Sequence, residues 1–107
     1  MREVSVHEFA SARADGAFAI DVRQQFEYTA GHAPGVAFMP EGEVFDRIHH
    51  LPKGETVYVV CRSGNRSAFV ADALTRLGFD AVNVAGGTAA WEAAGYPVVR
   101  GTALNVA

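Results

Sequence analysis

The sequence contains little sulfur and no long apolar segment. Its 107 residues include one cysteine, Cys61, so no internal disulfide can form. Small secreted domains that depend on disulfides carry several cysteines, which favours a reducing compartment here. The first residues, MREVSVHEFASARADG, are charged and lack the apolar core of a signal peptide, and no later run is long enough to span a membrane. We therefore expect a cytoplasmic protein without a membrane partner.

Basic charge is scarce as well. Nine Lys and Arg face twelve Asp and Glu, giving a formal net charge of −3, whereas binding to nucleic acid requires a basic surface. Nucleic acid is therefore not an expected partner. No metal or other cofactor is expected either. His49 and His50 are adjacent and point about 100° apart on a helix, away from any familiar ligand spacing. Gly86 and Gly87 lack the remaining glycines and the lysine of a nucleotide-binding loop.

Apolar runs alternate with amphipathic ones along the chain. GAFAIDV (16–22) and TVYVVC (56–61) are typical of strands buried on both faces of a parallel sheet, and VAFM (36–39) and AVNVAG (81–86) are weaker strand candidates. Helical spacing occurs over 5–14, 23–31, 41–51, 65–78 and 88–95. This order predicts one α/β domain over residues 1–107.

The longest predicted helix, 65–78, has a clear apolar pattern. Five of its residues are expected to share one face, and Gly78 is expected to end the helix. The five are Ala68, Val70, Ala71, Leu74 and Leu77.

Cys61 lies where a predicted buried strand ends and a predicted helix follows. In open α/β sheets, ligands bind at the carboxyl ends of the strands. The next residues, RSGNRS, are small or basic, so several backbone N–H groups can converge on one anion. These amides, the helix dipole and two arginines favour a thiolate over a thiol, so Cys61 is a candidate nucleophile. The alternative is a small core residue that happens to end a strand.

Three stretches together resemble one family. CRSGNRS is similar to the active-site loop of rhodanese-type sulfurtransferases, AIDVRQQFEYTAGHAPGVAFMP to their Asp-Val-Arg and Gly-His-x-Pro-Gly signature, and GFDAVNVAGGTAAWEAAGYPV to their closing segment. The match covers nearly the whole chain. The resemblance implies a single rhodanese domain with a parallel sheet of about five strands, helices on both faces, and a cysteine that carries sulfur as a persulfide.

The resemblance also implies roles for the motif residues. Cys61 is the expected catalytic residue, and the substrate is expected to be bound by Arg62, Ser63, Gly64, Asn65, Arg66 and Ser67. Asp21 and Arg23 are expected to support the loop structurally, with Asp21 in an ion pair or network. Arg66, at the helix start, can pair with Asp21 or Glu27, whereas Arg62 is expected to act on donor binding. His32 is expected to form a hydrogen bond within the turn around Gly31, Pro34 and Gly35.

The expected activity is transfer of sulfane sulfur from thiosulfate, a polysulfide or a persulfide to a thiol or cyanide. Thiosulfate-specific vertebrate members of the family are basic at the positions of Ser63 and Glu27, so polysulfides or persulfides are expected to fit better. A persulfide carrier or regulatory module that serves a sulfur-accepting partner protein remains an alternative. A related phosphatase or arsenate reductase is another, but those loops resemble Cys-x5-Arg, and here Arg66 comes one residue early.

Overall fold

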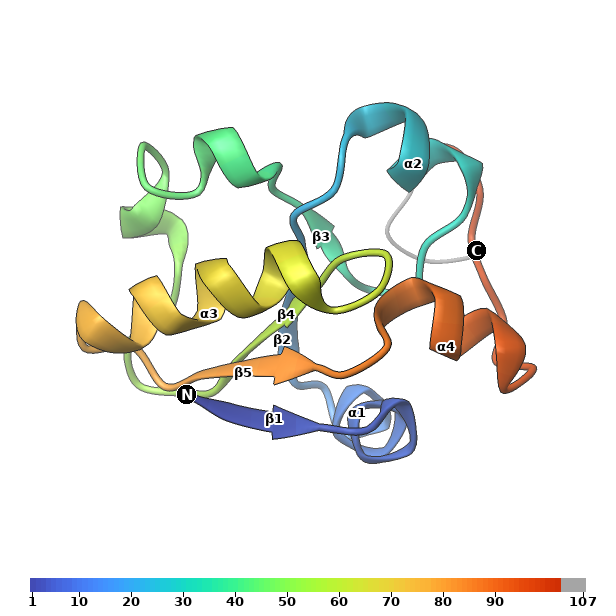
Figure 1. The fold of residues 1–107 in the computed structure, drawn as a ribbon, viewed down its shortest axis with the longest axis horizontal. Coiled ribbons are helices and arrows are strands. Elements are labelled where there is room, and N and C mark those ends of the chain that lie inside the picture. The colour runs from blue at the N-terminus through green and yellow to red at the C-terminus, as the bar shows by residue number, and fades with distance from the viewer. Residues whose placement is uncertain (103–107) are drawn as a thin grey trace.

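Five parallel strands form the centre of the protein, in the spatial order β1-β5-β4-β2-β3 (Figure 1). A computed structural model describes residues 1–102. The strands are β1 (Arg2–Val4), β2 (Phe18–Asp21), β3 (Ala37–Phe38), β4 (Val57–Val60) and β5 (Ala81–Val84). The predicted α/β class, with one parallel sheet of five strands, is confirmed.

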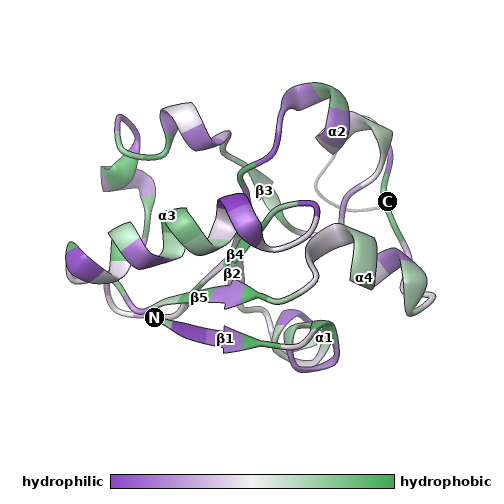
Figure 2. Ribbon diagram, viewed as in Figure 1, coloured by the Kyte–Doolittle hydropathy of each residue, from purple (hydrophilic) through white to green (hydrophobic). Residues whose placement is uncertain are grey.

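Helices cover both faces of this sheet. The elements are α1 (Val6–Ala14), α2 (Gln25–Ala30), α3 (Asn65–Arg76) and α4 (Gly87–Ala93), with short 3-10 turns η1 (Glu41–Glu43) and η2 (Ile48–His50). Successive side chains of β4 point to opposite faces of the sheet, so they enter two separate apolar cores. Val57 and Val59 pack with α3, whereas Val60 packs with Phe9 of α1 and Trp91 of α4. Apolar residues accordingly dominate β4, VYVV, whereas most of β1 is hydrophilic (Figure 2).

Two details of the predicted elements are wrong. The segment 41–51 is not a continuous helix but contains only η1 and η2. Gly42 is a poor helix former, and Pro52 disfavours a helical conformation at Leu51, which is extended. In α3, Val70, Ala71 and Leu74 are buried as predicted, but Leu77 is 51% exposed because the helix ends at Arg76.

The edge strand β1 was not among the strands expected from apolar runs. It is three residues long, and its exposed Arg2 and Glu3 hide the strand signal. β1 pairs with β5 so that Glu3 lies beside Asn83. Within residues 1–102, none of the helices combines the length and apolar character needed to cross a membrane.

Candidate active site

Cys61 lies directly after β4, at the carboxyl end of the sheet, and α3 begins four residues later at Asn65. The connecting loop lies between α2 and the start of α4 (Figure 1). Gly64 caps the helix with φ +102°, in the left-handed region, and a Cβ there would come 3.2 Å from the Gly86 nitrogen. Only glycine suits this tight return of the backbone. The predicted order of strand, loop and helix is therefore present.

The sulfur of Cys61 receives hydrogen bonds from the loop that surrounds it. The Gly64 N–H lies 3.1 Å from Sγ and the Ser67 hydroxyl 3.2 Å from it. Burial raises the pKa of this thiol, but the donors from Ser67, Gly64 and Ser63 together outweigh burial and hold the pKa below its usual range. The loop therefore favours the thiolate, which is the nucleophilic form of cysteine.

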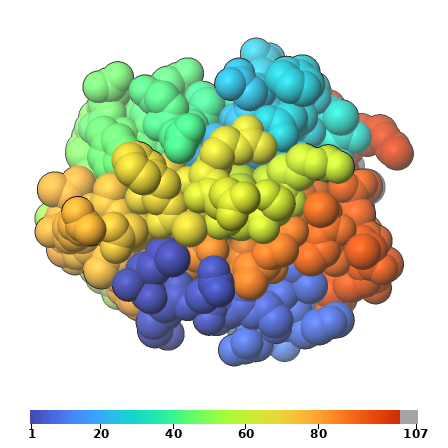
Figure 3. Space-filling view, viewed as in Figure 1, coloured from blue at the N-terminus to red at the C-terminus, as the bar shows by residue number. Residues whose placement is uncertain are grey.

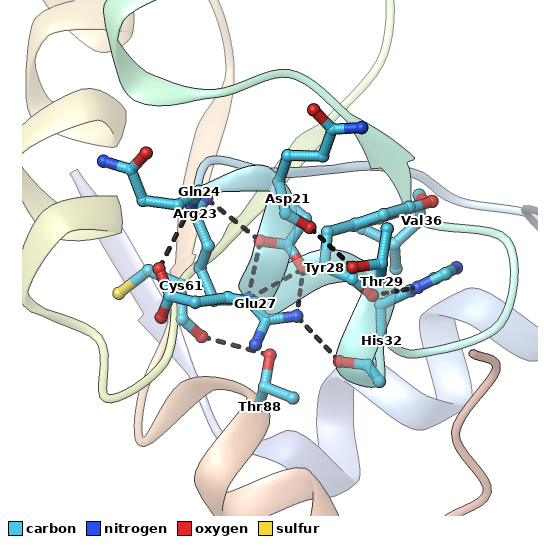
Figure 4. Close-up of polar contacts among 12 residues, drawn as sticks. Asp21, Arg23, Gln24, Glu27, Tyr28, Thr29, His32, Val36, Cys61 and Thr88 are labelled. Carbon is cyan, nitrogen blue, oxygen red and sulfur yellow. Dashed lines mark hydrogen bonds and ion pairs between the residues drawn. The ribbon is translucent and has the colours of Figure 1, made fainter. Parts of the chain in front are cut away.

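The start of α4 holds the Cys61 loop from the other side. The Thr88 N–H donates to the Cys61 carbonyl at 2.8 Å and the Ala89 N–H to the Arg62 carbonyl at 2.9 Å. The Thr88 hydroxyl also donates to the Cys61 carbonyl, as Figure 4 shows. Gly87 has φ +55°, and a Cβ there would lie 2.7 Å from the Arg62 carbonyl carbon. Nothing in the sequence indicated this contact between the start of α4 and the Cys61 loop.

Arg66 forms a bidentate ion pair with Glu27 of α2, one of the two partners predicted for it. The two N–O distances are 2.8 and 2.9 Å, and the side chains are 35% and 15% exposed, respectively. The Arg66 hydrogen bond, opposed by burial, lowers the pKa of Glu27 from its ordinary 4.5 to about 2. The same pair raises the pKa of Arg66. The negative charge of Glu27 is therefore compensated by Arg66.

Asp21 and Arg23 form the ion pair expected for Asp21, and both are buried. Arg23 donates to both Asp21 oxygens and, at 2.8 Å, to the Gly31 carbonyl (Figure 4). This connects the end of β2 to the turn after α2, so the pair positions α2. That this pair supports the Cys61 loop stays a prediction.

His32 occupies the turn as expected. Its Nδ1 donates to the Tyr28 carbonyl at 2.8 Å, and its ring stacks on Tyr28 with the centroids 3.6 Å apart. The Tyr28 hydroxyl donates to the Val36 carbonyl at 2.6 Å, which ties the end of α2 to the approach to β3. These contacts give His32 a role in shaping the turn.

A hollow of about 310 Å³ adjoins the Cys61 loop. Arg62 lines it, and among residues 1–102 the Arg62 guanidinium has no ion-pair partner, so its charge is available to an anionic ligand. Ser63 and Asn65 are exposed, whereas Gly64 and Ser67 are buried. The lining consists of Arg23, Phe26, Glu27, Ala30, Gly31, Arg62 and Glu92.

Asn83 is a site residue that the sequence reasoning missed. It is fully buried in β5, and its Oδ1 accepts from the Ser67 hydroxyl at 2.6 Å. A single polar residue within the apolar run AVNV was the available signal, because buried amides need hydrogen-bond partners.

The fold and the site define a class: a parallel α/β domain in which hydrogen-bond donors surround the sulfur of one buried cysteine just before a helix. A family model described as the rhodanese-like domain matches residues 5–94. The chain belongs to the rhodanese family.

Two of the relatives are named for sulfur transfer or sulfur carriage. The thiosulfate sulfurtransferase GlpE of Pseudomonas entomophila is 32% identical over 97 residues, covering 90% of this chain and 88% of GlpE. YrkF of Bacillus subtilis, named as a candidate sulfur carrier protein, is 40% identical over 73 residues, and the match covers 67% of this chain but 40% of YrkF. A crystal structure of a rhodanese-related protein from Thermoplasma volcanium has a TM-score of 0.87 and 30% identity, covering 92% of this chain and 98% of that one.

Proposed function

We propose that this protein is a sulfurtransferase in which Cys61 carries the transferred sulfur. The Cys61 thiolate attacks the sulfane sulfur of a donor, and a new S–S bond forms while the bond from that sulfur to the donor breaks. The donor leaves with the electron pair, as a thiolate from a persulfide or as sulfite from thiosulfate. A thiol in its thiolate form, or cyanide, then attacks the outer sulfur, and the electron pair returns to Sγ.

The observation that carries this proposal is the ring of donors around Sγ. Gly64 and Ser67 donate to a sulfur that is almost entirely buried. Such a loop stabilises one compact negative charge, as in a thiolate or persulfide. A tetrahedral oxyanion would need a guanidinium directed into the loop, but Arg66 is engaged by Glu27. This pairing argues against phosphatase or arsenate reductase chemistry.

We further propose that an anionic polysulfide or persulfide is the preferred donor. Among residues 1–102 the Arg62 guanidinium has no ion-pair partner, and Ser63 supplies no second positive charge to the sulfonate end of thiosulfate. A dedicated carrier that passes sulfur to a partner protein is the second candidate, because YrkF, named as a candidate sulfur carrier, is similar over 73 residues.

Intact-mass analysis after exposure to thiosulfate, polysulfide and glutathione persulfide tests the proposal. We expect the protein to gain the mass of one sulfur atom, to lose it to cyanide or a thiol, and to gain more from polysulfide or persulfide than from thiosulfate. Cys61→Ser should take up none while keeping its fold. Sulfur uptake by that variant, or no uptake by the wild type from any donor, contradicts the assignment. Repeated turnover with free thiols indicates an enzyme, whereas a single discharge indicates a carrier.

A further inference from the structure

A chain of hydrogen bonds leads from Cys61 to the edge strand β1. The Ser67 hydroxyl lies 3.2 Å from Cys61 Sγ and 2.6 Å from Asn83 Oδ1. Asn83 Nδ2 in turn donates to Glu3 Oε2 at 2.7 Å and to the Gly64 carbonyl at 3.2 Å. Glu3 and Asn83 are paired across β1 and β5. In Figure 3 the first residues of the chain, in dark blue, lie beside α3 on the same face.

The partners of Asn83 determine how its amide is oriented. A carboxylate and a backbone carbonyl can only accept, so the NH₂ group must face Glu3 and Gly64, and the amide oxygen must face Ser67. Ser67 has one hydroxyl proton and two acceptors within reach, the Asn83 oxygen and the Cys61 sulfur. The two acceptors therefore compete for this proton, and the shorter distance favours Asn83.

We propose that Asn83, held by Glu3, is a positioning residue that controls the donation of the Ser67 proton to Cys61 and thereby sets the reactivity of the thiolate. When Cys61 is a thiol, Ser67 donates to Asn83 and can accept from the S–H. When Cys61 is a thiolate, Ser67 turns toward the sulfur. The role in turnover rests on the proposed function: once Sγ is bonded to a second sulfur it loses its charge, and the Ser67 proton returns to Asn83.

Other charged groups around Cys61 must stay constant in any test of this proposal. From α3, Arg66 interacts with the sulfur, and it is itself paired with Glu27 of α2 and influenced by Glu41 of η1. Asp21 and Arg23 at the end of β2 neutralise each other. Arg62 and, from α4, Glu92 line the adjoining hollow. The variants below change none of these groups.

Asn83→Ala is the direct test, because it removes the competing acceptor. Cys61 is the only thiol in the sequence, so thiolate absorbance reports on it alone. We expect the titration midpoint to fall, and alkylation by iodoacetamide at a pH well below that midpoint to accelerate about threefold to tenfold. If Asn83 had only a structural role, its removal would loosen the loop, take hydrogen-bond donors away from the sulfur and raise the midpoint. A raised or unchanged midpoint overturns the proposal.

A double-mutant cycle shows whether Asn83 acts through Ser67. Ser67→Ala alone should raise the midpoint, and adding Asn83→Ala to it should produce no further change. An equal effect of Asn83→Ala in both backgrounds would mean that Asn83 acts by another route.

Variants of the exposed Glu3 keep the test decisive even if Asn83→Ala does not fold. Glu3→Ala releases the Asn83 amide and should shift the midpoint in the same direction, by less. Glu3→Gln keeps an accepting oxygen and should match the wild type. If both Glu3 variants shift the Cys61 titration midpoint equally, or if neither shifts it, the hydrogen bond between Glu3 and Asn83 does not influence Cys61, and this part of the proposal is wrong. These readouts need no sulfur donor, so they can succeed even if the sulfurtransferase proposal fails.

Discussion

The ion pair between Glu27 and Arg66 should make the stability of this protein depend on pH in a defined window. The carboxylate forms two hydrogen bonds, of 2.8 and 2.9 Å, with the guanidinium, and the pKa of Glu27 falls from 4.5 to about 2. Because the folded-state pKa lies below the unfolded value, the pair stabilises the fold above about pH 4.5. That contribution is lost as pH falls toward 2.

The size of the effect follows from the pKa difference and the exposure of the pair. The change from 4.5 to about 2 corresponds to at most about 3–4 kcal/mol. The Arg66 side chain is 35% exposed, so solvent screening reduces this figure. We therefore expect Glu27→Gln to cost about 1–2 kcal/mol of the free energy of unfolding at pH 7.

Urea unfolding of wild type and Glu27→Gln across a pH series measures this directly. The difference between the two proteins should be full at pH 5 and above and should shrink between pH 4.5 and 2. The exposed Arg76–Asp72 pair on α3 supplies the control: Asp72→Asn should cost less than about 0.5 kcal/mol at pH 7. A Glu27→Gln difference that is absent at pH 7, or that does not change with pH, refutes the reasoning.

Three further predictions concern the loop and the start of α4 that holds it. Arg62→Ala should raise KM for an anionic donor severalfold and leave the free energy of unfolding within about 0.5 kcal/mol; an equal KM would remove Arg62 from donor binding. Gly87→Ala should cost about 2 kcal/mol or more in urea unfolding, because a Cβ collides with the Cys61 and Arg62 carbonyls; a neutral result would mean that the backbone yields there. Ser63→Lys should improve sulfur transfer from thiosulfate more than from polysulfide, and high salt should reduce the gain. An equal gain with both donors contradicts the charge argument.

The parts of the fold that were predicted correctly are those with local, apolar signals. β2 and β4 are buried strands with nearly continuous apolar residues, and α3 has an apolar face bounded by Gly78. The segment 41–51 was misread because Val44, Ile48 and Leu51 have helical spacing, and all three are at least partly buried in the core. Two short 3-10 turns bury these residues in place of a continuous helix. The periodic pattern therefore predicted which residues are buried but not the conformation of the segment.

In the candidate site, too, the features with a local sequence signal were predicted better than the contacts between distant segments. The loop from Cys61 to Ser67 is continuous in the sequence, and its glycine and hydroxyls indicated the ring of donors that the structure contains. The contacts that hold this ring are distant in the chain. Arg66 and Glu27 are 39 residues apart, and Asn83 and Glu3 are 80 apart. The sequence limited the partner of Arg66 to Asp21 or Glu27, but it gave no sign of the contact between Asn83 and Glu3, because pairing over such separations depends on the order of the strands.

Glu27 illustrates how such a distant contact changes a functional argument. As an isolated carboxylate near the loop it would repel thiosulfate, and replacing it by arginine would look favourable. Paired with Arg66, its charge is largely cancelled, and an arginine at this position would instead face Arg66 and repel it. Under the proposed donor preference, the charge that discriminates between donors therefore comes from groups beside the loop without an ionic partner. Arg62 is such a group, and Ser63 is the adjacent position where a second positive charge would have to be added.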